Sequence, residues 1–186
     1  MTILKAEVRR MMLEQRMQIP LDSALRAAAA VCDFFFKHVT VPDGAVVAGY
    51  APIRGELDDM PILRTLTRRG KICALPHMAS EEAPLAFRFW NEITPMTTGK
   101  YGITEPAPDR RLSPDIVLVP LAAFDINRHR LGYGAGCYDR TLAALAKTKP
   151  VLSIGLGYET QLCDEIPAEE TDIRMDMIIT DGKVYQ

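Results

Sequence analysis

A short apolar run followed by three closely spaced glycines constrains this chain most. Residues 116–124, IVLVPLAAF, are rich in β-branched side chains and bounded by turn residues, as is typical of a buried strand. After a polar turn, Gly132, Gly134 and Gly136 stand at alternate positions, and a helix is expected to begin near Cys137. Glycines at this spacing allow positive φ angles, and their N–H groups can converge on an anion at the helix N-terminus. The stretch therefore predicts a phosphate-binding loop.

The same glycines also fit a plainer interpretation as a tight turn. The loop is not a Walker A sequence, since no Gly-Lys-Ser/Thr follows, and it does not match a dinucleotide fingerprint. Seven residues separate Phe124 from Gly132, whereas that fingerprint turns directly from strand to helix. Asp139, in the first turn of the expected helix, can be favourable with the helix dipole alone. If a phosphate binds here, Asp139 is a hard oxygen ligand where Mg²⁺ would sit.

Length and composition are those of an ordinary globular protein. The chain has 186 residues, of which 48% are hydrophobic and 25% charged, and its net charge is −2 without an acidic or basic block. A chain of this length can bury a full core, so we expect residues 1–186 to form a single domain. Nucleic acid is not an expected partner, because it needs a concentrated basic face.

The cysteines and the N-terminus bear on the compartment. Four cysteines at positions 32, 73, 137 and 163 are too scattered for a zinc site and form no C-x-x-C motif. The first residues lack the apolar segment of a signal peptide, and no run reaches membrane-spanning length. We therefore expect a reduced, cytoplasmic protein without a membrane partner, and we expect it to be a monomer.

Helical and strand patterns alternate along the chain. A helix starting at Pro61 lies between two apolar runs, which favours a parallel sheet with a right-handed crossover. Residues 85–90 alternate apolar and polar side chains, which indicates an antiparallel or edge strand, and residues 91–114 show no sustained period. The expected fold is α/β: three layers, with a mainly parallel open sheet of about six strands and helices on both faces. The expected elements are helices at 3–17, 22–38, 61–69 and from 137, and strands at 45–50, 71–76, 85–90, 116–124, 151–158 and 175–180.

The central stretch resembles the signature of an enzyme family. It reads VPLAAFD, a short turn, and then RLGYGAGCYDR. It is similar to the 5-formyltetrahydrofolate cyclo-ligases, also called 5,10-methenyltetrahydrofolate synthetases, in which V-P-x-x-A-F-D precedes R-L-G-x-G-x-G-x-Y-D-R. Ala135 and Cys137 are less usual at their positions and bear on the fine shape of a folate pocket. The matching residues are Val119, Pro120, Ala123, Phe124, Asp125, Arg130, Leu131, Gly132, Gly134, Gly136, Tyr138, Asp139 and Arg140.

The resemblance spans nearly the whole chain and implies a reaction. In that family, ATP and 5-formyltetrahydrofolate give 5,10-methenyltetrahydrofolate, ADP and phosphate, with Mg²⁺. ATP phosphorylates the formyl oxygen, and N10 then attacks the formyl carbon. Positioning and charge neutralisation would supply most of the rate. No nucleophilic side chain is needed, and the candidates for charge stabilisation are Lys5, Arg9 and Arg140.

The resemblance also implies which residues bind. Lys5 and Arg9, four residues apart on one helical face, match a pair that reaches the ATP phosphates; a solvated basic face is the alternative. Glu56 matches a glutamate that contacts the pterin, with a solvated loop acid as the alternative, and Asp139 and Asp176 match magnesium ligands. Residues expected to bind ATP are Lys5, Arg9, Arg130, Leu131, Gly132, Tyr133, Gly134, Ala135, Gly136, Cys137, Tyr138 and Arg140. Residues expected to bind the folate are Ala51, Glu56, Tyr101, Tyr133, Gly134, Ala135, Gly136 and Cys137.

Some residues keep two interpretations. Tyr101 is the position that matches a folate-packing aromatic, and plain packing is its alternative. Arg140 reaches a phosphate or forms a surface salt bridge, and Cys137 lines the folate pocket or is a reactive thiol at a helix N-terminus. Two other functions also fit a phosphate loop on such a sheet. They are a sugar-phosphate isomerase or lactonase, and a nucleotide-binding module without catalytic activity.

Overall fold

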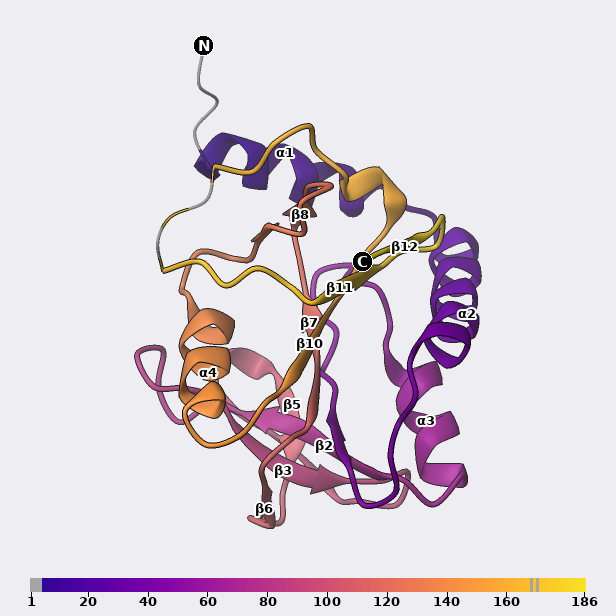
Figure 1. Cartoon of the computed structure of the whole chain (residues 1–186), viewed down its shortest axis with the longest axis vertical. Helices are drawn as coiled ribbons and strands as arrows, with labels where there is room; N and C mark the ends of the chain where they lie inside the picture. Colours follow the sequence, from indigo (N-terminus) through magenta and orange to yellow (C-terminus); the bar gives the residue numbers. More distant parts are fainter. Residues whose placement is uncertain (1–4, 168, 170) are drawn as a thin grey trace.

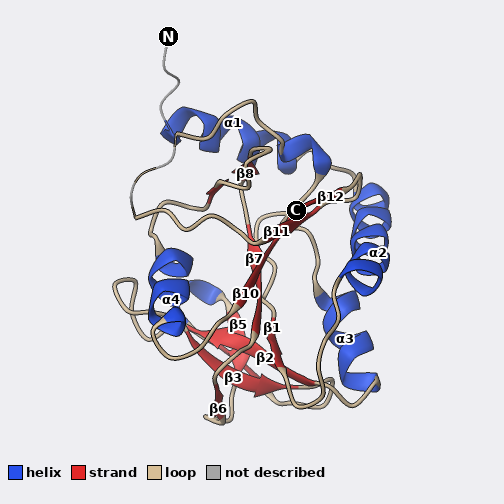
Figure 2. Cartoon of the chain, viewed as in Figure 1, coloured by secondary structure: helices blue, strands red, loops and turns tan. Residues whose placement is uncertain are grey.

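Eight strands form one sheet at the centre of the chain (Figures 1 and 2). The computed structural model describes residues 5–167, 169 and 171–186. The sheet strands are β1 (Val46–Ala48), β2 (Ile72–His77), β3 (Ala86–Trp90), β6 (Arg111–Leu112), β7 (Ile116–Pro120), β10 (Leu152–Leu156), β11 (Met177–Ile179) and β12 (Val184–Tyr185). The helices are α1 (Lys5–Arg16), α2 (Leu21–His38), α3 (Met60–Arg68) and α4 (Cys137–Ala146). Shorter elements are β4 (Met96–Thr98), η1 (Lys100–Gly102), β5 (Thr104–Pro106), β8 (Ala123–Phe124), β9 (Arg130–Leu131) and η2 (Glu159–Gln161).

The strand order is β12-β11-β10-β7-β1-β2-β3-β6. The five strands from β11 to β2 are parallel, and β12, β3 and β6 are antiparallel to their neighbours. The α/β class and all six expected strands are confirmed, but the strand expected at 116–124 ends at Pro120, and Ala123–Phe124 (β8) pair with β9 in a separate two-stranded sheet. The expected strand number was too low, because β6 and β12 have two residues each, too few for a periodic pattern.

Helices cover both faces of the sheet, as expected, and successive side chains of β1 point alternately to the two helical layers. Val47 packs in the cluster that contains Phe35 of α2 and Leu63 of α3. Its neighbour Val46 points to the opposite face, in the cluster that contains Leu142 of α4. Figure 2 shows α2 and α3 on one side of the sheet and α4 on the other. The three-layer arrangement follows.

Helix α1 packs differently from the other three. The expected helix at 3–17 begins outside the described residues, since positions 1–4 are not described, and its described part spans Lys5–Arg16. It lies across the end of the molecule where β8 is found (Figure 1), and Val8 and Met12 pack on Ala123 and Leu131. The carboxyl ends of β1 and β7 point to this end, so α1 borders the region where open parallel sheets bind ligands.

Residues 91–114 contain more structure than expected. Strands β4 and β5 form an antiparallel hairpin, with Thr97 opposite Glu105, and β6 extends the sheet beside β3. The residues of β4 are all exposed, so no apolar alternation marks this strand in the sequence. The hairpin is held by the buried Glu105 carboxylate, which accepts hydrogen bonds from His77 at 2.8 Å and from Arg88 at 3.3 Å.

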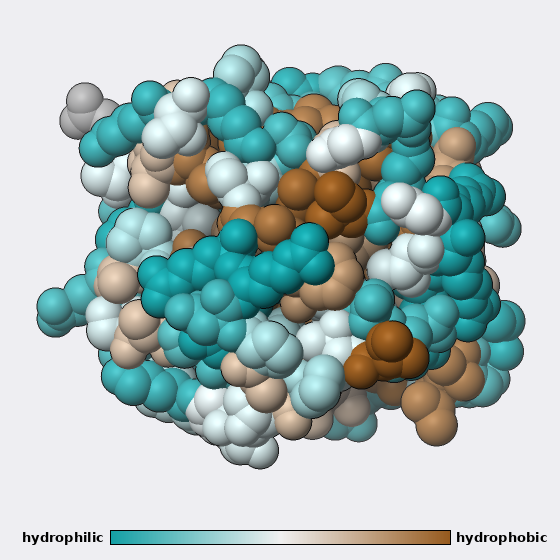
Figure 3. All heavy atoms as spheres, turned by 90° about the horizontal axis from the view of Figure 1, so that it is seen from below, coloured by the Kyte–Doolittle hydropathy of each residue, from teal (hydrophilic) through white to brown (hydrophobic). Residues whose placement is uncertain are grey.

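The surface agrees with the ordinary composition of the chain. Figure 3, seen from below the view of Figure 1, shows a face on which hydrophilic residues surround a group of hydrophobic residues near the middle. Among the described residues, no helix is both long and apolar enough to cross a membrane.

Candidate active site

A cleft of about 1070 Å³ opens at the carboxyl ends of β1 and β7, beside α1. Its walls come from α1, the loop after β1, the β4–β5 hairpin, the glycine loop and the segment at 169–173. Sixteen of the seventeen residues expected to bind a ligand or metal line this cleft; Asp176 does not. They are Lys5, Arg9, Ala51, Glu56, Tyr101 and the unbroken run from Arg130 to Arg140.

The glycine loop requires glycine at two of its three positions. Gly134 has φ of 104° and Gly136 has φ of 63°, in the left-handed region that side chains rarely adopt. Gly136 is also the N-cap of α4, so the unpaired N–H groups of that helix open next to the loop. A Cβ at Gly134 would lie 3.4 Å from the Arg9 guanidinium carbon. The loop thus combines backbone donors with a cation from α1.

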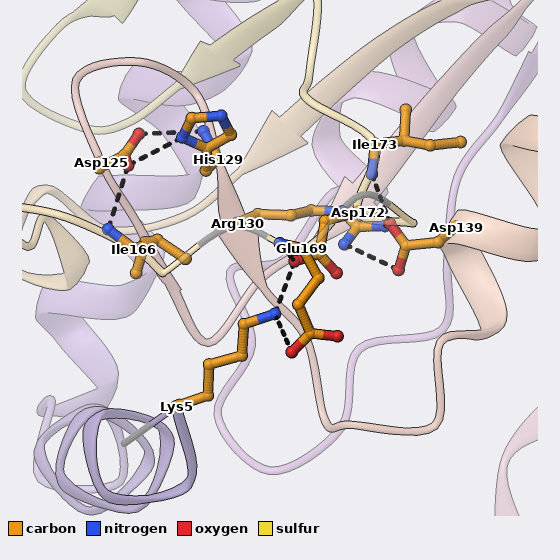
Figure 4. A network of polar contacts seen from close by, with 9 residues as sticks. All are labelled: Lys5, Asp125, His129, Arg130, Asp139, Ile166, Glu169, Asp172 and Ile173. Carbon is orange, nitrogen blue, oxygen red and sulfur yellow. Dashed lines mark hydrogen bonds and ion pairs between the residues drawn. The ribbon is translucent and has the colours of Figure 1, made fainter. Parts of the chain in front are cut away.

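The two expected cations of α1 face the cleft rather than the solvent. Arg9 donates from Nε to the carbonyl of Gly132 at 2.6 Å. Lys5 Nζ lies 2.6 Å from Asp172 Oδ2 and 2.9 Å from Glu169 Oε1 (Figure 4). Burial lowers the pKa of Lys5, but the two carboxylates outweigh burial and leave this pKa raised. The positions of both side chains disfavour the alternative of a solvated face.

Asp139 meets a buried arginine at the first turn of α4. Arg130, whose side chain is 5% exposed, donates from Nη2 to Asp139 Oδ1 at 3.0 Å. The same oxygen accepts the backbone N–H of Ile173 at 3.0 Å, which brings residues 171–173 against the first turn of α4 (Figure 4). The buried Nε of Arg130 has no hydrogen-bond partner within the described chain. A ligand acceptor that enters the cleft could satisfy it.

Asp125 holds the turn before Arg130 and the backbone at Ile166. Its carboxylate is fully buried and accepts hydrogen bonds from the backbone N–H of His129 at 3.0 Å and of Ile166 at 3.1 Å. The His129 ring also lies 3.1 Å from this carboxylate (Figure 4). The aspartate that ends V-P-x-x-A-F-D therefore fixes the turn before Arg130 against the backbone of Ile166.

The structure does not bring Asp176 to the expected metal site. The Asp176 carboxylate accepts hydrogen bonds from the backbone N–H and the hydroxyl of Ser153, at 2.8 and 2.7 Å. Both residues lie near the amino ends of β10 and β11, away from the cleft at the carboxyl ends. The sequence argument took a metal as the partner that an acid in an apolar strand needs, whereas a serine on the neighbouring strand fills that need. Asp172, four residues earlier, lines the cleft instead.

Two carboxylates in the cleft have the donor chemistry for Mg²⁺. Across the described residues, no group of three or more His, Cys, Asp and Glu side chains has a metal-binding arrangement. Asp139 and Asp172 both line the cleft, on either side of Arg130 (Figure 4). Magnesium commonly uses one or two carboxylates and completes its shell with phosphate oxygens and water. The pair fits a magnesium ion that arrives with a nucleotide.

The far end of the cleft holds a buried acid. Glu56 is 8% exposed, and its Oε2 accepts the backbone N–H of Ile53 at 2.9 Å. Burial raises the pKa of Glu56, and the Ile53 N–H and the Arg16 charge partly oppose that rise. The alternative of a solvated loop acid therefore does not hold. Tyr101 lies at the rim with a φ of 59°. It is 65% exposed, so its ring is available to a ligand and contributes little to the core.

Arg140 supports the loop in a way that neither of its alternatives anticipated, whereas Cys137 lines the cleft, as one of its interpretations expected. Arg140 donates from Nη1 to the carbonyl of Ala135 at 2.7 Å and from Nη2 to the carbonyl of Glu81. It therefore ties the glycine loop to the segment before β3, and no carboxylate pairs with it in the described chain. Cys137 Sγ lies 3.7 Å from Arg140 Nη2 at the wall of the cleft.

Three site residues were missed in the sequence. Asp172 and Glu169 stand in a polar segment without a period, and no local signal distinguishes them from solvated acids. Arg16 is buried at the end of α1 and does not line the cleft, but it donates a hydrogen bond to Tyr133, which does. It stands seven positions after Arg9, on the same helical face. That spacing is the signal that could have found it.

An open parallel sheet whose cleft joins a basic glycine loop to a buried acid defines an α/β protein with a site for a phosphorylated ligand. Comparison with known proteins gives the family. The model described as the 5-formyltetrahydrofolate cyclo-ligase family matches residues 2–181. The chain belongs to the 5-formyltetrahydrofolate cyclo-ligase family.

Individual relatives agree with this assignment. A 5-formyltetrahydrofolate cyclo-ligase of Mycolicibacterium smegmatis is 32% identical over 185 residues, covering 95% of this chain and 93% of that protein. One of Escherichia coli K12 is 36% identical over 148 residues, covering 75% of this chain and 80% of that protein. The solved structure of Aquifex aeolicus 5,10-methenyltetrahydrofolate synthetase matches with a TM-score of 0.84 at 28% identity, over 99% of this chain and 93% of that one.

The glycine loop gives a first prediction. Gly134→Ala places a Cβ at a φ of 104° and against Arg9, so the free energy of unfolding should fall by about 1 kcal/mol. Gly132→Ala is the matched control, since its Cβ would meet nothing within 4 Å and its φ is outside the left-handed region. Urea unfolding of both variants measures the difference. Equal losses would contradict a conformational requirement at Gly134.

Proposed function

We propose that this chain cyclises 5-formyltetrahydrofolate to 5,10-methenyltetrahydrofolate at the expense of ATP, releasing ADP and phosphate. One observation carries the proposal: a single cleft holds the cations and backbone donors at the glycine loop together with a buried carboxylate, Glu56, from the loop after β1. Such a cleft can hold a triphosphate and a ring with N–H donors side by side. Family membership and the names of the relatives support the same reaction.

The chemistry explains why two ligands must lie side by side. A formamide oxygen is a poor leaving group, so the γ-phosphoryl group is first transferred to it, which breaks the bond to ADP. N10 then attacks the formyl carbon and a C–N bond forms. The N10 proton passes to an oxygen of the departing phosphate as the C–O bond breaks. Phosphoryl transfer depends mainly on in-line positioning and on charge neutralisation, and ring closure depends on proximity. A general base and a nucleophilic side chain are not required.

The phosphate end of the cleft supplies the positive charge. Lys5, Arg9 and the amides of residues 132–136 would surround the triphosphate, and Gly136 places it at the N-terminus of α4. A bound triphosphate would replace Asp172 and Glu169 as the partner of Lys5. Arg140 would act by keeping the loop in shape, because its donors are bound to the Ala135 and Glu81 carbonyls.

Asp139 and Asp172 would hold the magnesium ion in this proposal, in place of the originally expected pair of Asp139 and Asp176. The ion would neutralise charge on the β- and γ-phosphates. As the triphosphate draws Lys5 away from Asp172, the Asp172 carboxylate becomes free for the metal. The exchange of partners would thus couple nucleotide binding to metal binding.

The folate would occupy the other end of the cleft. The buried Glu56 carboxylate would accept N–H groups of the pterin ring, and Ala51, Tyr101 and Tyr133 would form the surrounding wall. A sugar-phosphate isomerase or lactonase would need the phosphate-binding loop but not the buried Glu56 carboxylate. The monomeric state, the cytoplasmic location, the single domain and the absence of nucleic acid remain predictions of the sequence.

Product absorbance tests the proposal directly. The wild-type chain should form 5,10-methenyltetrahydrofolate from 5-formyltetrahydrofolate when ATP and Mg²⁺ are present and should form none when ATP is omitted. Melting shifts with ATP and Mg²⁺, with 5-formyltetrahydrofolate and with a sugar phosphate separate the rival functions. A shift with ATP alone would support a binding module, and a shift with the sugar phosphate alone would support an isomerase or lactonase.

Lys5 gives a second prediction. Lys5→Ala removes a charge-assisted contact to the triphosphate, so the KM for ATP should rise about tenfold while the KM for folate stays within about twofold. Arg10→Ala is the matched control on the same helix, because Arg10 is exposed and pairs with Glu14. Steady-state kinetics with each substrate varied in turn measures both constants. Unchanged ATP kinetics in Lys5→Ala would assign Lys5 a structural role through Asp172.

Glu56 gives a third prediction. Glu56→Gln keeps the shape of the side chain but removes its charge, so the Kd for 5-formyltetrahydrofolate should rise about tenfold. ATP binding should be unaffected, since the phosphate end has its own partners. Calorimetry with each ligand measures this, with Glu92→Gln, which pairs with Arg68 outside the cleft, as the control. An equal loss of both ligands would indicate a folding defect instead.

A further inference from the structure

Arg16 stands out among the charged residues that the proposed reaction does not use. It lies at the carboxyl end of α1 and is 2% exposed, although arginine is rarely buried unless its guanidinium is paired. Lys5, Arg9 and Arg16 are spaced by four and seven residues, so they lie on the same helical face. The first two face the phosphate end of the cleft. Arg16 is placed at the other end, toward Glu56.

The Arg16 guanidinium joins three separate segments. Its Nη1 donates to the Leu121 carbonyl after β7 at 3.0 Å, and its Nε donates to the Arg54 carbonyl in the loop after β1 at 3.2 Å. Its Nη2 donates to the hydroxyl of Tyr133, in the glycine loop, at 2.5 Å. A planar fork of donors can satisfy three acceptors at fixed angles, which a lysine ammonium cannot reproduce.

Two partners of Arg16, Arg54 and Tyr133, line the cleft, and Tyr133 is the one that accepts the Arg16 hydrogen bond on its side chain. Its ring centroid lies 5.7 Å from the Arg16 guanidinium carbon and 5.5 Å from that of Arg54. Burial raises the pKa of the Tyr133 hydroxyl; nearby Glu56 raises it further, and Arg16 lowers it. Arg16, Tyr133 and Glu56 therefore form one group at the folate end of the cleft. Besides two backbone carbonyls, Arg16 thus binds a side chain of the glycine loop that lines the cleft.

We infer that Arg16 is a positioning residue for the folate: through the Tyr133 hydroxyl it fixes the wall against which the pterin and Glu56 meet. The inference rests on the proposed function, because it assigns the folate to this end of the cleft. It also gives α1 two tasks, with Lys5 and Arg9 at the nucleotide and Arg16 at the folate.

A double-mutant cycle tests this role. The four proteins are the wild type, Arg16→Lys, Tyr133→Phe and the double variant, with the exposed Arg10→Lys as a control on the same helix. Arg16→Lys and Tyr133→Phe should each raise the KM for 5-formyltetrahydrofolate about tenfold and leave the KM for ATP within about twofold. The double variant should be no worse than the more affected single variant, because both changes remove the same contact.

The outcomes separate positioning from simple stabilisation. Additive effects on the folate KM, or equal rises in both KM values, would overturn the inference, as would an unchanged folate KM with a lowered urea midpoint. If Arg16→Lys does not fold, Tyr133→Phe decides alone, and an unchanged folate KM overturns the inference. If the wild type forms no product, the proposed function fails, and the same cycle is judged on the folate Kd from calorimetry. Absence of any folate binding would overturn both.

Discussion

Three cations, Lys5, Arg9 and Arg130, converge on one cleft, and this close approach of like charges is the constraint on which the site depends. Each has an internal partner: Lys5 meets Asp172 and Glu169, Arg9 the Gly132 carbonyl, and Arg130 the Asp139 carboxylate. Without such partners, buried or half-buried charges would strongly destabilise the fold. In the proposed function, a polyanion would replace the carboxylates that hold Lys5, and the freed Asp172 would then be available to a metal ion.

This constraint also explains α1. Its sequence is polar and predicts only a modest amphipathic helix, and Val8 and Met12 supply its small apolar contact with the end of the sheet. The rest of its attachment is polar: Lys5 forms ion pairs, and Arg9 and the buried Arg16 donate charge-assisted hydrogen bonds to backbone carbonyls. A helix that is attached mainly by charged contacts can lie on the rim of a cleft, where apolar packing is limited and ligands must enter. It is therefore well suited to carry binding residues along its whole length.

The sequence was most informative where apolar periodicity and glycine spacing are strong. All six expected strands, the α/β class and the glycine loop were predictable, because each depends on local patterns of burial or backbone conformation. Strands β4, β5, β6 and β12 were not: β4 and β5 are held by backbone pairing and by Glu105, and β6 and β12 have only two residues each. For a similar reason the sequence placed Asp176 in the cleft, whereas Asp172 is the aspartate that lines it. Both are aspartates near an apolar strand, and only the register of β10 and β11 shows that Ser153 already satisfies Asp176.

The buried Glu56 carboxylate lowers the stability of the fold, and in the proposed function it binds the folate. Because burial raises its pKa above the unfolded value, the folded state binds a proton more tightly, and stability falls as pH rises through that range. Asp172 behaves in the opposite way: burial raises its pKa, but Lys5 lowers it by more, so its contribution is present above the unfolded value and is lost as pH falls through the folded one. At neutral pH the ion pair of Lys5 and Asp172 therefore stabilises the folded state, whereas the buried, charged Glu56 carboxylate destabilises it. Ligand N–H groups would offset that cost, so folate binding should draw part of its free energy from the strain of burying Glu56.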